Sequence, residues 1–339
     1  MQYYINSNKM FFFLILFSST LITISSNSWL GCWIGLEINL LSFITIMSNS
    51  NNLLLSESCL KYFLIQSISS MNFLFMILLN MMFMKMMEFN NFLSIMINSS
   101  LLMKMGTAPF HFWFPHIMEG LSWLNCFILM TWQKIAPTIL LSYYFNFKFL
   151  IIIMILTLMI GAIGGLNQTS LRKILSFSSI NHLGWMIMSI LMSENLWMFY
   201  FLIYTFLIFI MTIMFYMLNS FFINQLFLIN LNNMIKFNIF FNMLSLGGLP
   251  PLLGFAPKWI IINFLINNKF NFFMLLFIMS SLITLLFYIR ISYSSFIFNY
   301  MKIKFLKLYM KNNLMIMFQT MSMISITSLF ISTLMFYLM

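Results

Sequence analysis

Hydrophobic runs of about twenty residues follow one another along almost the whole chain, and they are continuous rather than alternating. A run of this length is what an α-helix needs to cross a lipid bilayer. A membrane β-barrel alternates apolar and polar residues, and it needs more turns than eleven glycines and six prolines supply. With 62% hydrophobic and 6% charged residues, a soluble fold lacks the polar residues to cover its surface. The sequence therefore predicts an all-α polytopic membrane protein.

Clusters of Asn, Ser, Lys, Gly and Pro divide the chain into about eleven predicted transmembrane helices. The connections are too short for a soluble domain, so we expect a single transmembrane domain over residues 1–339. The first run follows Lys9 without a small-residue cleavage site, which favours a first span over a signal peptide. The predicted spans are 10–25, 29–47, 58–82, 91–107, 121–144, 149–166, 173–192, 196–219, 237–266, 270–297 and 314–338.

Composition and basic residues together predict a location. Asp and Val are absent and Ala occurs only four times, and the codons of all three begin with G, so the gene is rich in A and T, as organelle genomes are. An odd number of spans places the termini on opposite sides, and the positive-inside rule directs the more basic side toward the site of synthesis. We therefore expect the N-terminus on the side of synthesis, which in a mitochondrion is the matrix, and the C-terminus on the opposite side, the intermembrane space. The N-terminal side carries Lys9, Arg172, Lys173, Lys236, Lys302, Lys304, Lys307 and Lys311, and the other side carries Lys85, Lys148 and Lys269.

Several classes of function are excluded by what the sequence lacks. The net charge of +11 comes from basic residues scattered between and inside hydrophobic runs, which argues against a nucleic-acid partner. Three well-separated cysteines form no CxxC pair, and His111 and His116 have only Glu119 as an acidic neighbour, so we expect no iron–sulfur cluster and no metal site. The Gly-rich segments 161–168 and 246–251 follow no predicted β-strand, so close helix packing and a helix break explain them better than a dinucleotide loop.

All six prolines fall in three clusters, and each cluster has a lysine beside it. A proline removes a backbone donor and clashes with the preceding turn, so the helix breaks or kinks there. Within a bilayer, broken backbone is tolerated only where protein or a hydrated cavity satisfies the freed groups. The clusters lie within 104–115, 130–137 and 244–259, and the lysines are Lys104, Lys134 and Lys258.

The three lysines are costly at these places. A lysine inside a span costs about 2.5–3.5 kcal/mol even on the lenient insertion scale. Near a helix end the ammonium group can instead reach the interface, which requires no function. Lys104 and Lys258 flank breaks rather than predicted interfaces, and Lys134 lies deep within its span. We therefore favour a functional role over this snorkelling.

Glu37 is the acid predicted to lie well inside the membrane, about eight residues into an otherwise uncharged span. A carboxylate beside a lysine keeps the lysine protonated, so making and breaking a Glu–Lys contact would load and release a proton. His182 shares a helix face with Ser178 and would extend this proton relay. A hydrogen bond from His182 to a neighbouring helix is an equally good explanation.

Long motifs cover nearly the whole chain. They are SNSWLGCWIGLEINLLSF at 26–43, ESCLKYFLIQ at 57–66, KMGTAPFHFWFP at 104–115, MTWQKIAP at 130–137, GAIGGLNQTSLRKILSFSSINHLGWM at 161–186 and LSLGGLPPLLGFAPKW at 244–259. In these motifs the sequence resembles the subunit 2 family of mitochondrial NADH:ubiquinone oxidoreductase, respiratory complex I, in its insect form.

The resemblance implies a fold and site residues. This family is similar to cation/proton antiporter subunits, which implies inverted five-helix repeats with two discontinuous helices. By matching motif, it implies a central acid at Glu37, the lysines of the broken helices at Lys104 and Lys258, and a bridging lysine at Lys134. The animal form of the family lacks three N-terminal helices of its bacterial relatives, so neighbouring subunits or lipid would cover the exposed side.

The resemblance also implies cofactors and partners. In this family NADH, FMN, iron–sulfur clusters and ubiquinone are bound by other subunits, so we expect no cofactor in this chain. The implied partners are other membrane-arm and accessory subunits of complex I, together with lipid such as cardiolipin.

The predicted function is that of a core membrane-arm subunit of complex I, the proton-translocating NADH:ubiquinone reductase. It would couple electron transfer from NADH to ubiquinone to proton translocation. Two alternatives stay open: a scaffold subunit whose buried charges only lock helices together, and a stand-alone proton/cation antiporter. The predicted relay consists of Glu37, Lys104, Lys134, Lys258 and His182.

Overall fold

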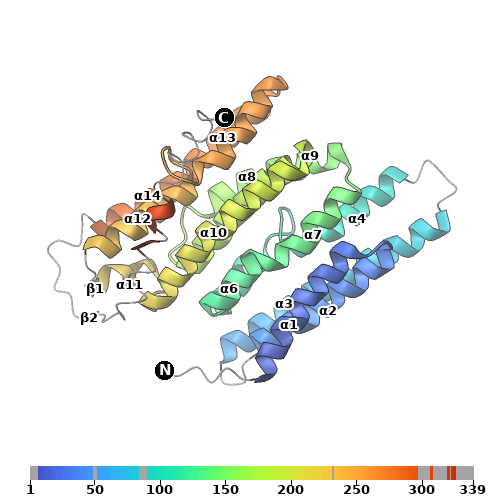
Figure 1. The fold of residues 1–339 in the computed structure, drawn as a ribbon, viewed down its shortest axis with the longest axis horizontal. Coiled ribbons are helices and arrows are strands. Elements are labelled where there is room, and N and C mark those ends of the chain that lie inside the picture. The colour runs from blue at the N-terminus through green and yellow to red at the C-terminus, as the bar shows by residue number, and fades with distance from the viewer. Residues whose placement is uncertain are drawn as a thin grey trace. The chain divides into compact units, whose positions relative to one another are not determined.

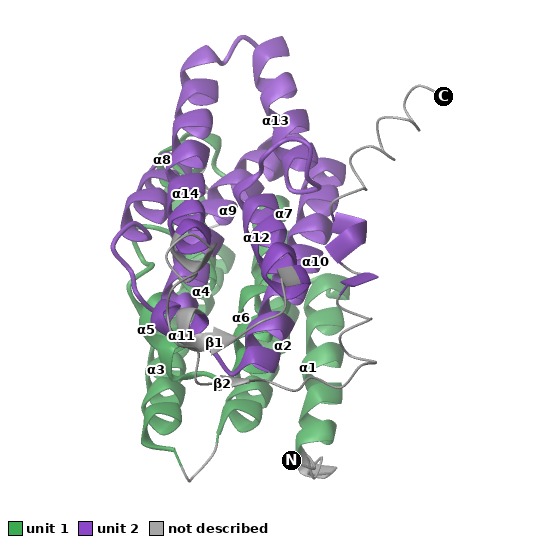
Figure 2. Cartoon of the chain, turned by 90° about the vertical axis from the view of Figure 1, so that its left-hand side faces the viewer, with its two compact units in different colours: residues 1–153 green, residues 154–339 purple. Residues whose placement is uncertain are grey.

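The computed structural model of the chain describes residues 7–48, 52–83, 90–230, 233–296, 306–307, 319–320 and 322–325. Nearly all of them are helical, which confirms the predicted all-α class. The chain divides into two compact units, residues 1–153 and residues 154–339, and each is described by itself (Figure 2). The expectation of one transmembrane domain over the full length stays a prediction.

Unit 1 is a bundle of helices in which α1 packs on α2, α2 on α3 and α3 on α4. The helix α4 also packs on α7 (Figure 1), and these two helices carry Lys104 and Lys134. Ser28 caps α2, because its hydroxyl accepts a hydrogen bond from the backbone N–H of Gly31. The helices are α1 (Ser7–Ser25), α2 (Trp29–Met47), α3 (Leu53–Phe83), α4 (Asn90–Met105), α5 (Trp113–Gly120), α6 (Trp123–Met130), α7 (Trp132–Tyr143) and the first part of α8 (Phe147–Gly164).

Unit 2 is centred on α9 (Leu171–Met192), which is almost completely buried and packs against α10, α13 and α14. The part of α8 that belongs to this unit lies very close to α9, which explains its small residues. A Cβ at Gly161 would lie 2.5 Å from the backbone N of Asn181. Two short strands, β1 and β2, pair in parallel, with Ile229 opposite Leu306. The remaining elements are α10 (Glu194–Leu218), α11 (Ile223–Leu228), β1 (Ile229–Asn230), α12 (Asn233–Gly247), α13 (Phe255–Asn267), α14 (Asn271–Phe296) and β2 (Leu306–Lys307).

Two helix breaks share one local geometry. After α4, the backbone N–H groups of Gly106 and Thr107 both donate to the carbonyl of Leu102, and Gly106 is left-handed at φ 74°. The same pattern ends α12. A left-handed glycine after the last helical residue is a common way to satisfy the terminal carbonyls of a helix.

The second break repeats the first residue by residue. The N–H groups of Gly248 and Leu249 both donate to the carbonyl of Leu244, and Gly248 is left-handed at φ 82°. In each break a proline follows three residues after the glycine, at Pro109 and at Pro251. The breaks therefore lie where the proline clusters predict them, after α4 and after α12.

The third proline cluster behaves differently. The span predicted at 121–144 is interrupted at Thr131, between α6 and α7, whereas Pro137 lies inside α7. The hydroxyl of Thr131 donates to the carbonyl of Phe127 at 2.7 Å, a local bond that competes with regular helix geometry. The interruption thus precedes the proline and places Lys134 in the first turn of α7.

Seven helices among the described residues are long and apolar enough to cross a membrane. Their outer faces carry many large exposed apolar side chains, which suits contact with lipid. Most predicted spans coincide with helices, but 237–266 is divided into α12 and α13, and α5 lies between predicted spans. The predicted span 314–338 and the basic run 302–311 lie outside the described residues, except for 306–307, 319–320 and 322–325. The seven are Trp29–Met47, Leu53–Met82, Trp123–Tyr143, Phe147–Gly164, Leu171–Met192, Glu194–Leu218 and Asn271–Tyr293.

Candidate functional site

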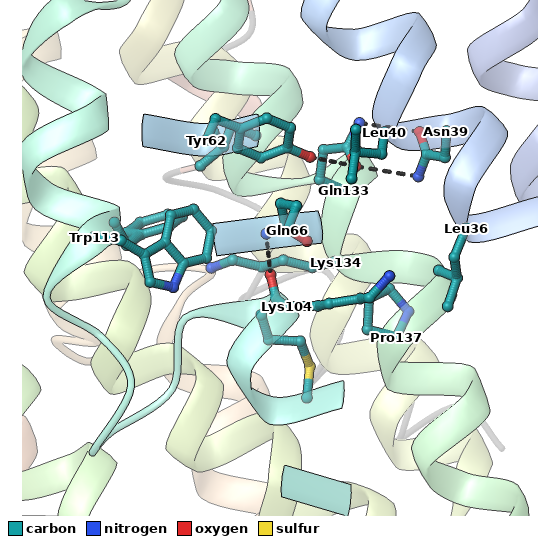
Figure 3. A pocket seen from close by; sticks show the side chains of 13 residues that line it. Leu36, Asn39, Leu40, Tyr62, Gln66, Lys104, Trp113, Gln133, Lys134 and Pro137 are labelled. Carbon is teal, nitrogen blue, oxygen red and sulfur yellow. Dashed lines mark hydrogen bonds between the residues drawn. The ribbon is translucent and has the colours of Figure 1, made fainter. Parts of the chain in front are cut away.

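Two of the predicted lysines line one cavity in unit 1. Lys104 is 7% exposed and Lys134 is 1% exposed, and both border a cavity of about 20 Å³ (Figure 3). That volume holds about one water molecule. The lysine cavity, as we call it, is lined by Leu36, Asn39, Leu40, Tyr62, Gln66, Lys104, Met105, Trp113, Phe114, Leu129, Gln133, Lys134 and Pro137.

Lys104 is held where α4 ends. The amide of Gln66 donates to the backbone carbonyl of Lys104 at 3.2 Å, and the indole N–H of Trp113 donates to the carbonyl of Met103 at 3.2 Å. The Gln66 amide satisfies a carbonyl at the end of the helix, and the Trp113 indole adds a second bond to the Met103 carbonyl, which also accepts from the N–H of Gly106. The end of α4 is therefore braced by α3 and α5, and Lys104 lies at this braced end.

Lys134 lies against an aromatic ring. Its Nζ is 5.2 Å from the centroid of the Phe114 ring, within the range of a cation–π interaction. Phe114 belongs to α5, the short helix that follows the first break. One turn further along α7, the hydroxyl of Thr138 donates to the carbonyl of Lys134 at 2.7 Å. An ammonium group in this setting is shielded from solvent on all sides by the protein.

A pair of amides borders the same cavity. Asn39 and Gln133 exchange two hydrogen bonds, each of 3.1 Å, and the hydroxyl of Tyr62 donates to Gln133 Oε1 at 3.4 Å (Figure 3). Sequence reasoning overlooked these three side chains and Gln66. The available signal was the presence of uncharged amides inside apolar runs, because buried amides require partners.

Glu37 lies next to this cavity without lining it. It is half-buried on α2, beside Leu36, and is near enough to Lys104 for the two charges to interact. The two side chains form no direct ion pair. A direct Glu–Lys pair joins Glu57 to Lys61 at 2.6 Å on the exposed face of α3. The structure thus places an acid next to the cavity that Lys104 lines.

Lys258 lies in unit 2 and faces the second helix break. It is 3% exposed, and its Nζ donates to the carbonyl of Gly247, the last residue of α12, at 2.8 Å. The Nζ also lies 5.6 Å from the centroid of the Trp185 ring. The negative end of the α12 dipole and the face of the indole both favour a cation at this point.

His182 has a partner that the sequence pattern did not indicate. Its Nδ1 lies 2.7 Å from the hydroxyl of Tyr200 on α10, and its ring centroid is 5.0 Å from that of Tyr204. The expected neighbour Ser178 instead donates to the carbonyl of Leu175 in its own helix. Tyr200 also stacks on Trp185, the ring that faces Lys258. His182 and Lys258 are therefore joined through aromatic side chains.

Other predicted features have structural surroundings only. The three cysteines are buried thiols, and no group of three or more His, Cys, Asp or Glu in the described part of the chain is arranged to hold a metal ion. Arg290 donates to the carbonyl of Leu166, which anchors α14 to the segment after α8.

Comparison with known proteins identifies relatives across the chain. Residues 26–284 match the family model described as NADH:quinone oxidoreductase/Mrp antiporter, transmembrane. NADH-ubiquinone oxidoreductase chain 2 of Anopheles gambiae is 52% identical over 91% of this chain and 90% of its own length. The protein of the same name from Aedes aegypti is 52% identical over 97% of this chain and 98% of its own length.

Solved structures share the fold at low identity. A chain of respiratory complex I from Thermus thermophilus superposes with a TM-score of 0.84 at 19% identity, over 96% of this chain and 78% of that one. A chain of the Mrp complex from a Dietzia species superposes with a TM-score of 0.74 at 14% identity, over 84% of this chain and 59% of that one. At these identities the likeness concerns the fold alone.

Proposed function

This chain belongs to the NADH:quinone oxidoreductase/Mrp antiporter family, and from that premise we propose that its buried lysines carry protons across the membrane. It is a membrane-arm subunit of respiratory complex I, as relatives 52% identical over nearly their whole length support. The activity of the complex couples electron transfer from NADH to ubiquinone to proton translocation. What the residues of this chain contribute is the passage of protons.

Several finer assignments belong to this proposal. The chain lies in the mitochondrial inner membrane with its N-terminus in the matrix and its C-terminus in the intermembrane space. Other subunits hold NADH, FMN, the iron–sulfur clusters and ubiquinone, and this chain holds no cofactor. Its partners are other complex I subunits and lipid such as cardiolipin, and it binds no nucleic acid.

The lysine cavity supports proton exchange in unit 1. Lys104 and Lys134 come from different helices, line one cavity and are both buried, and the cavity holds about one water molecule. A bridging water lets a proton pass from the ammonium group of one lysine to the neutral amine of the other. Glu37 tunes this exchange, because it lies beside Leu36 of the cavity wall and carries the opposite charge.

The second break supports a loading site in unit 2. A protonated Lys258 donates to the carbonyl of Gly247, whereas a neutral amine at the same place loses most of this attraction to the helix end. His182 and Tyr200 form the adjoining hydrogen bond, which can exchange a proton because each group both donates and accepts. The single observation that carries the proposal is the burial of all three lysines at 7% exposure or less, each at or beside an interrupted helix.

Two alternatives use the same residues. In a scaffold subunit, the buried charges would only hold helices together, and in a stand-alone antiporter, the chain would act outside complex I. Purification of the chain within the assembled complex excludes the second. The first is excluded by variants that keep the charge of a lysine but remove its ability to release a proton.

The decisive experiment compares Lys134→Met with Lys134→Arg in assembled complex reconstituted into vesicles. Protons translocated per NADH oxidised are measured after normalisation to the amount of complex. An arginine keeps the charge but does not deprotonate, so we expect both variants to lose coupled translocation. If the substitution raises the barrier to proton transfer by only about 1.4 kcal/mol, the rate of translocation falls roughly tenfold. Normal translocation in Lys134→Arg would assign Lys134 a structural role.

A further inference from the structure

Asn98 is a completely buried amide without a hydrogen-bond partner among the described residues. It lies on α4 at 0% exposure, and neither its Nδ2 nor its Oδ1 is bonded. A buried amide left in this condition is strongly destabilising, so native proteins pair such groups with protein or with ordered water. The position of Asn98 in unit 1 indicates that ordered water is the partner.

Asn98 shares one stripe of α4 with Ser94 and Met105, because residues four and eleven apart lie on the same helical face. Met105 lines the lysine cavity. Ser94, at the other end of the stripe, accepts a hydrogen bond of 3.3 Å from the side-chain amide of Asn146. Asn98 therefore lies on the line between the lysine cavity and Asn146.

A second polar row runs along α7 in the same interval. Lys134, Thr138 and Ser142 follow one another at steps of four residues, so they lie on one side of α7, and Asn146 follows in the linker before α8. Thr138 is 1% exposed, and its hydroxyl oxygen can still accept a hydrogen bond. The end of α4 borders the lysine cavity together with the start of α7, whereas Ser94 near the start of α4 contacts Asn146 just after α7. The two packed helices therefore run antiparallel, and the two polar rows run alongside each other.

The row ends at a less buried position. Asn146 is half-buried and caps the start of α8, where its side-chain oxygen accepts from the N–H of Phe149 at 3.3 Å. The stripe from Ser94 to Met105 is about 16 Å long at 1.5 Å per residue, with Asn98 about 6 Å from Ser94. One or two water molecules bridge the shorter gap of about 6 Å, and the longer interval from Asn98 to Met105 needs a short chain of them.

We propose that Asn98 holds water in a hydrated path that joins the lysine cavity to the Asn146 end of unit 1. The inference rests on the proposed function, because it assigns the path by which protons leave or reach Lys104 and Lys134. Asn98 acts as a positioning residue for that water, since its amide both donates and accepts. The occupant is water rather than an ion, because the described side chains of the stripe carry no charge before Lys104.

The direct test is a cryo-electron microscopy map of the wild-type complex at a resolution that shows ordered water. We expect density for water within hydrogen-bond distance of Asn98 Nδ2 or Oδ1, and further water toward Ser94 or Thr138. An Asn98 amide rotated onto a backbone carbonyl and surrounded by apolar atoms would overturn the proposal. This observation does not depend on whether the lysines translocate protons.

The functional test compares three variants in assembled complex. Asn98→Leu removes the amide at similar volume, Asn98→Ser keeps a hydroxyl and adds room for water, and Ser100→Ala is the matched control in the same helix. The hydroxyl of Ser100 already donates to the carbonyl of Ile97 at 2.7 Å and is 2% exposed. We expect proton-coupled turnover to fall roughly tenfold in Asn98→Leu, the effect of removing about one hydrogen bond from the path, with recovery in Asn98→Ser and no change in Ser100→Ala.

Equal losses in Asn98→Leu and Asn98→Ser would mean that packing matters and water does not, and wild-type turnover in Asn98→Leu would exclude the path. If Asn98→Leu does not assemble, the comparison of Asn98→Ser with Ser100→Ala and the water density decide the question. Failure of the proposed function can be distinguished from failure of the water path. In the first case, Lys134→Arg would translocate protons normally although ordered water is found at Asn98.

Discussion

Lys258 donates a hydrogen bond to the backbone carbonyl of Gly247 across the second helix break, at 2.8 Å. Gly247 is the last residue of α12, so the ammonium group caps a helix that ends inside the bundle. Because Lys258 itself belongs to α13, one side chain joins the two halves of the interrupted helix. The strength of that junction depends on whether the lysine is protonated.

Gly248→Ala should impair coupled turnover through Lys258. Gly248 is left-handed, and a Cβ there would lie 2.8 Å from Lys258 Cδ and 2.9 Å from its Nζ. The left-handed conformation alone costs an alanine about 1–2 kcal/mol, and the contact displaces the ammonium group from Gly247. Proton translocation per NADH, measured at equal complex content, should fall.

The neighbouring glycine supplies the control. A Cβ at Gly247 would meet Leu285 and Tyr288 at 3.5 Å, an ordinary contact, and Gly247 lies within α12. Gly247→Ala should therefore assemble and translocate protons as the wild type does. Equal behaviour of the two variants would show that the position of the Lys258 ammonium group is unimportant.

Glu37→Gln should lower coupled turnover more than it lowers assembly. The substitution keeps the shape of the side chain but removes a charge that acts on Lys104, and Glu37 makes no direct ion pair whose loss would unfold α2. Glu57→Gln is the control, since Glu57 pairs with Lys61 on an exposed helix face and should change neither quantity. Blue native electrophoresis measures assembly, and NADH-driven proton uptake measures coupling. A loss of assembly larger than the loss of coupling would contradict the assignment.

Tyr200→Phe should slow proton-coupled turnover several-fold while leaving complex content near normal. The change removes the hydroxyl that lies 2.7 Å from His182 Nδ1 but preserves the ring that stacks on Trp185. Tyr143→Phe serves as comparison, because the Tyr143 hydroxyl donates to the carbonyl of Ile24 at an exposed position. Unchanged turnover in Tyr200→Phe would leave His182 as a packing residue.

Asn39 and Gln133 should behave as a coupled pair. Either single change, Asn39→Leu or Gln133→Leu, leaves the other amide unsatisfied and should destabilise the subunit by about 1–3 kcal/mol. The double variant removes both amides, so its loss should be smaller than the sum of the two. Thermal inactivation of the assembled complex measures all three. Additive losses would indicate that the two amides do not interact in the complex.

Local chemistry explains which parts of the site could be predicted from the sequence. A proline blocks helical bonding wherever the chain folds, so the breaks after α4 and α12 follow from Pro109, Pro250 and Pro251. The burial of Lys104, Lys134 and Lys258 follows equally, because each is surrounded by apolar sequence.

Partners of the polar groups could not be predicted in the same way. Asn39 meets Gln133, and His182 meets Tyr200, through contacts between different helices. Such contacts depend on helix rotation and register, which the hydrophobic runs leave open because α2, α9 and α10 show little difference in hydrophobicity between their faces. The helix is interrupted at Thr131, ahead of Pro137, where the Thr131 hydroxyl bonds to the carbonyl of Phe127. The proline pattern could not predict this position.

The matching geometry of the two helix breaks has a consequence for any alignment of one half of the chain with the other. If Pro109 is superposed on Pro251, the residue opposite Lys258 is His116, and the residue opposite Lys104 is Leu246. One cation thus comes from the helix that enters its break, and the other from the helix that leaves it. Equivalent backbone therefore carries non-equivalent chemistry, and a substitution tested in one half is no guide to its counterpart in the other.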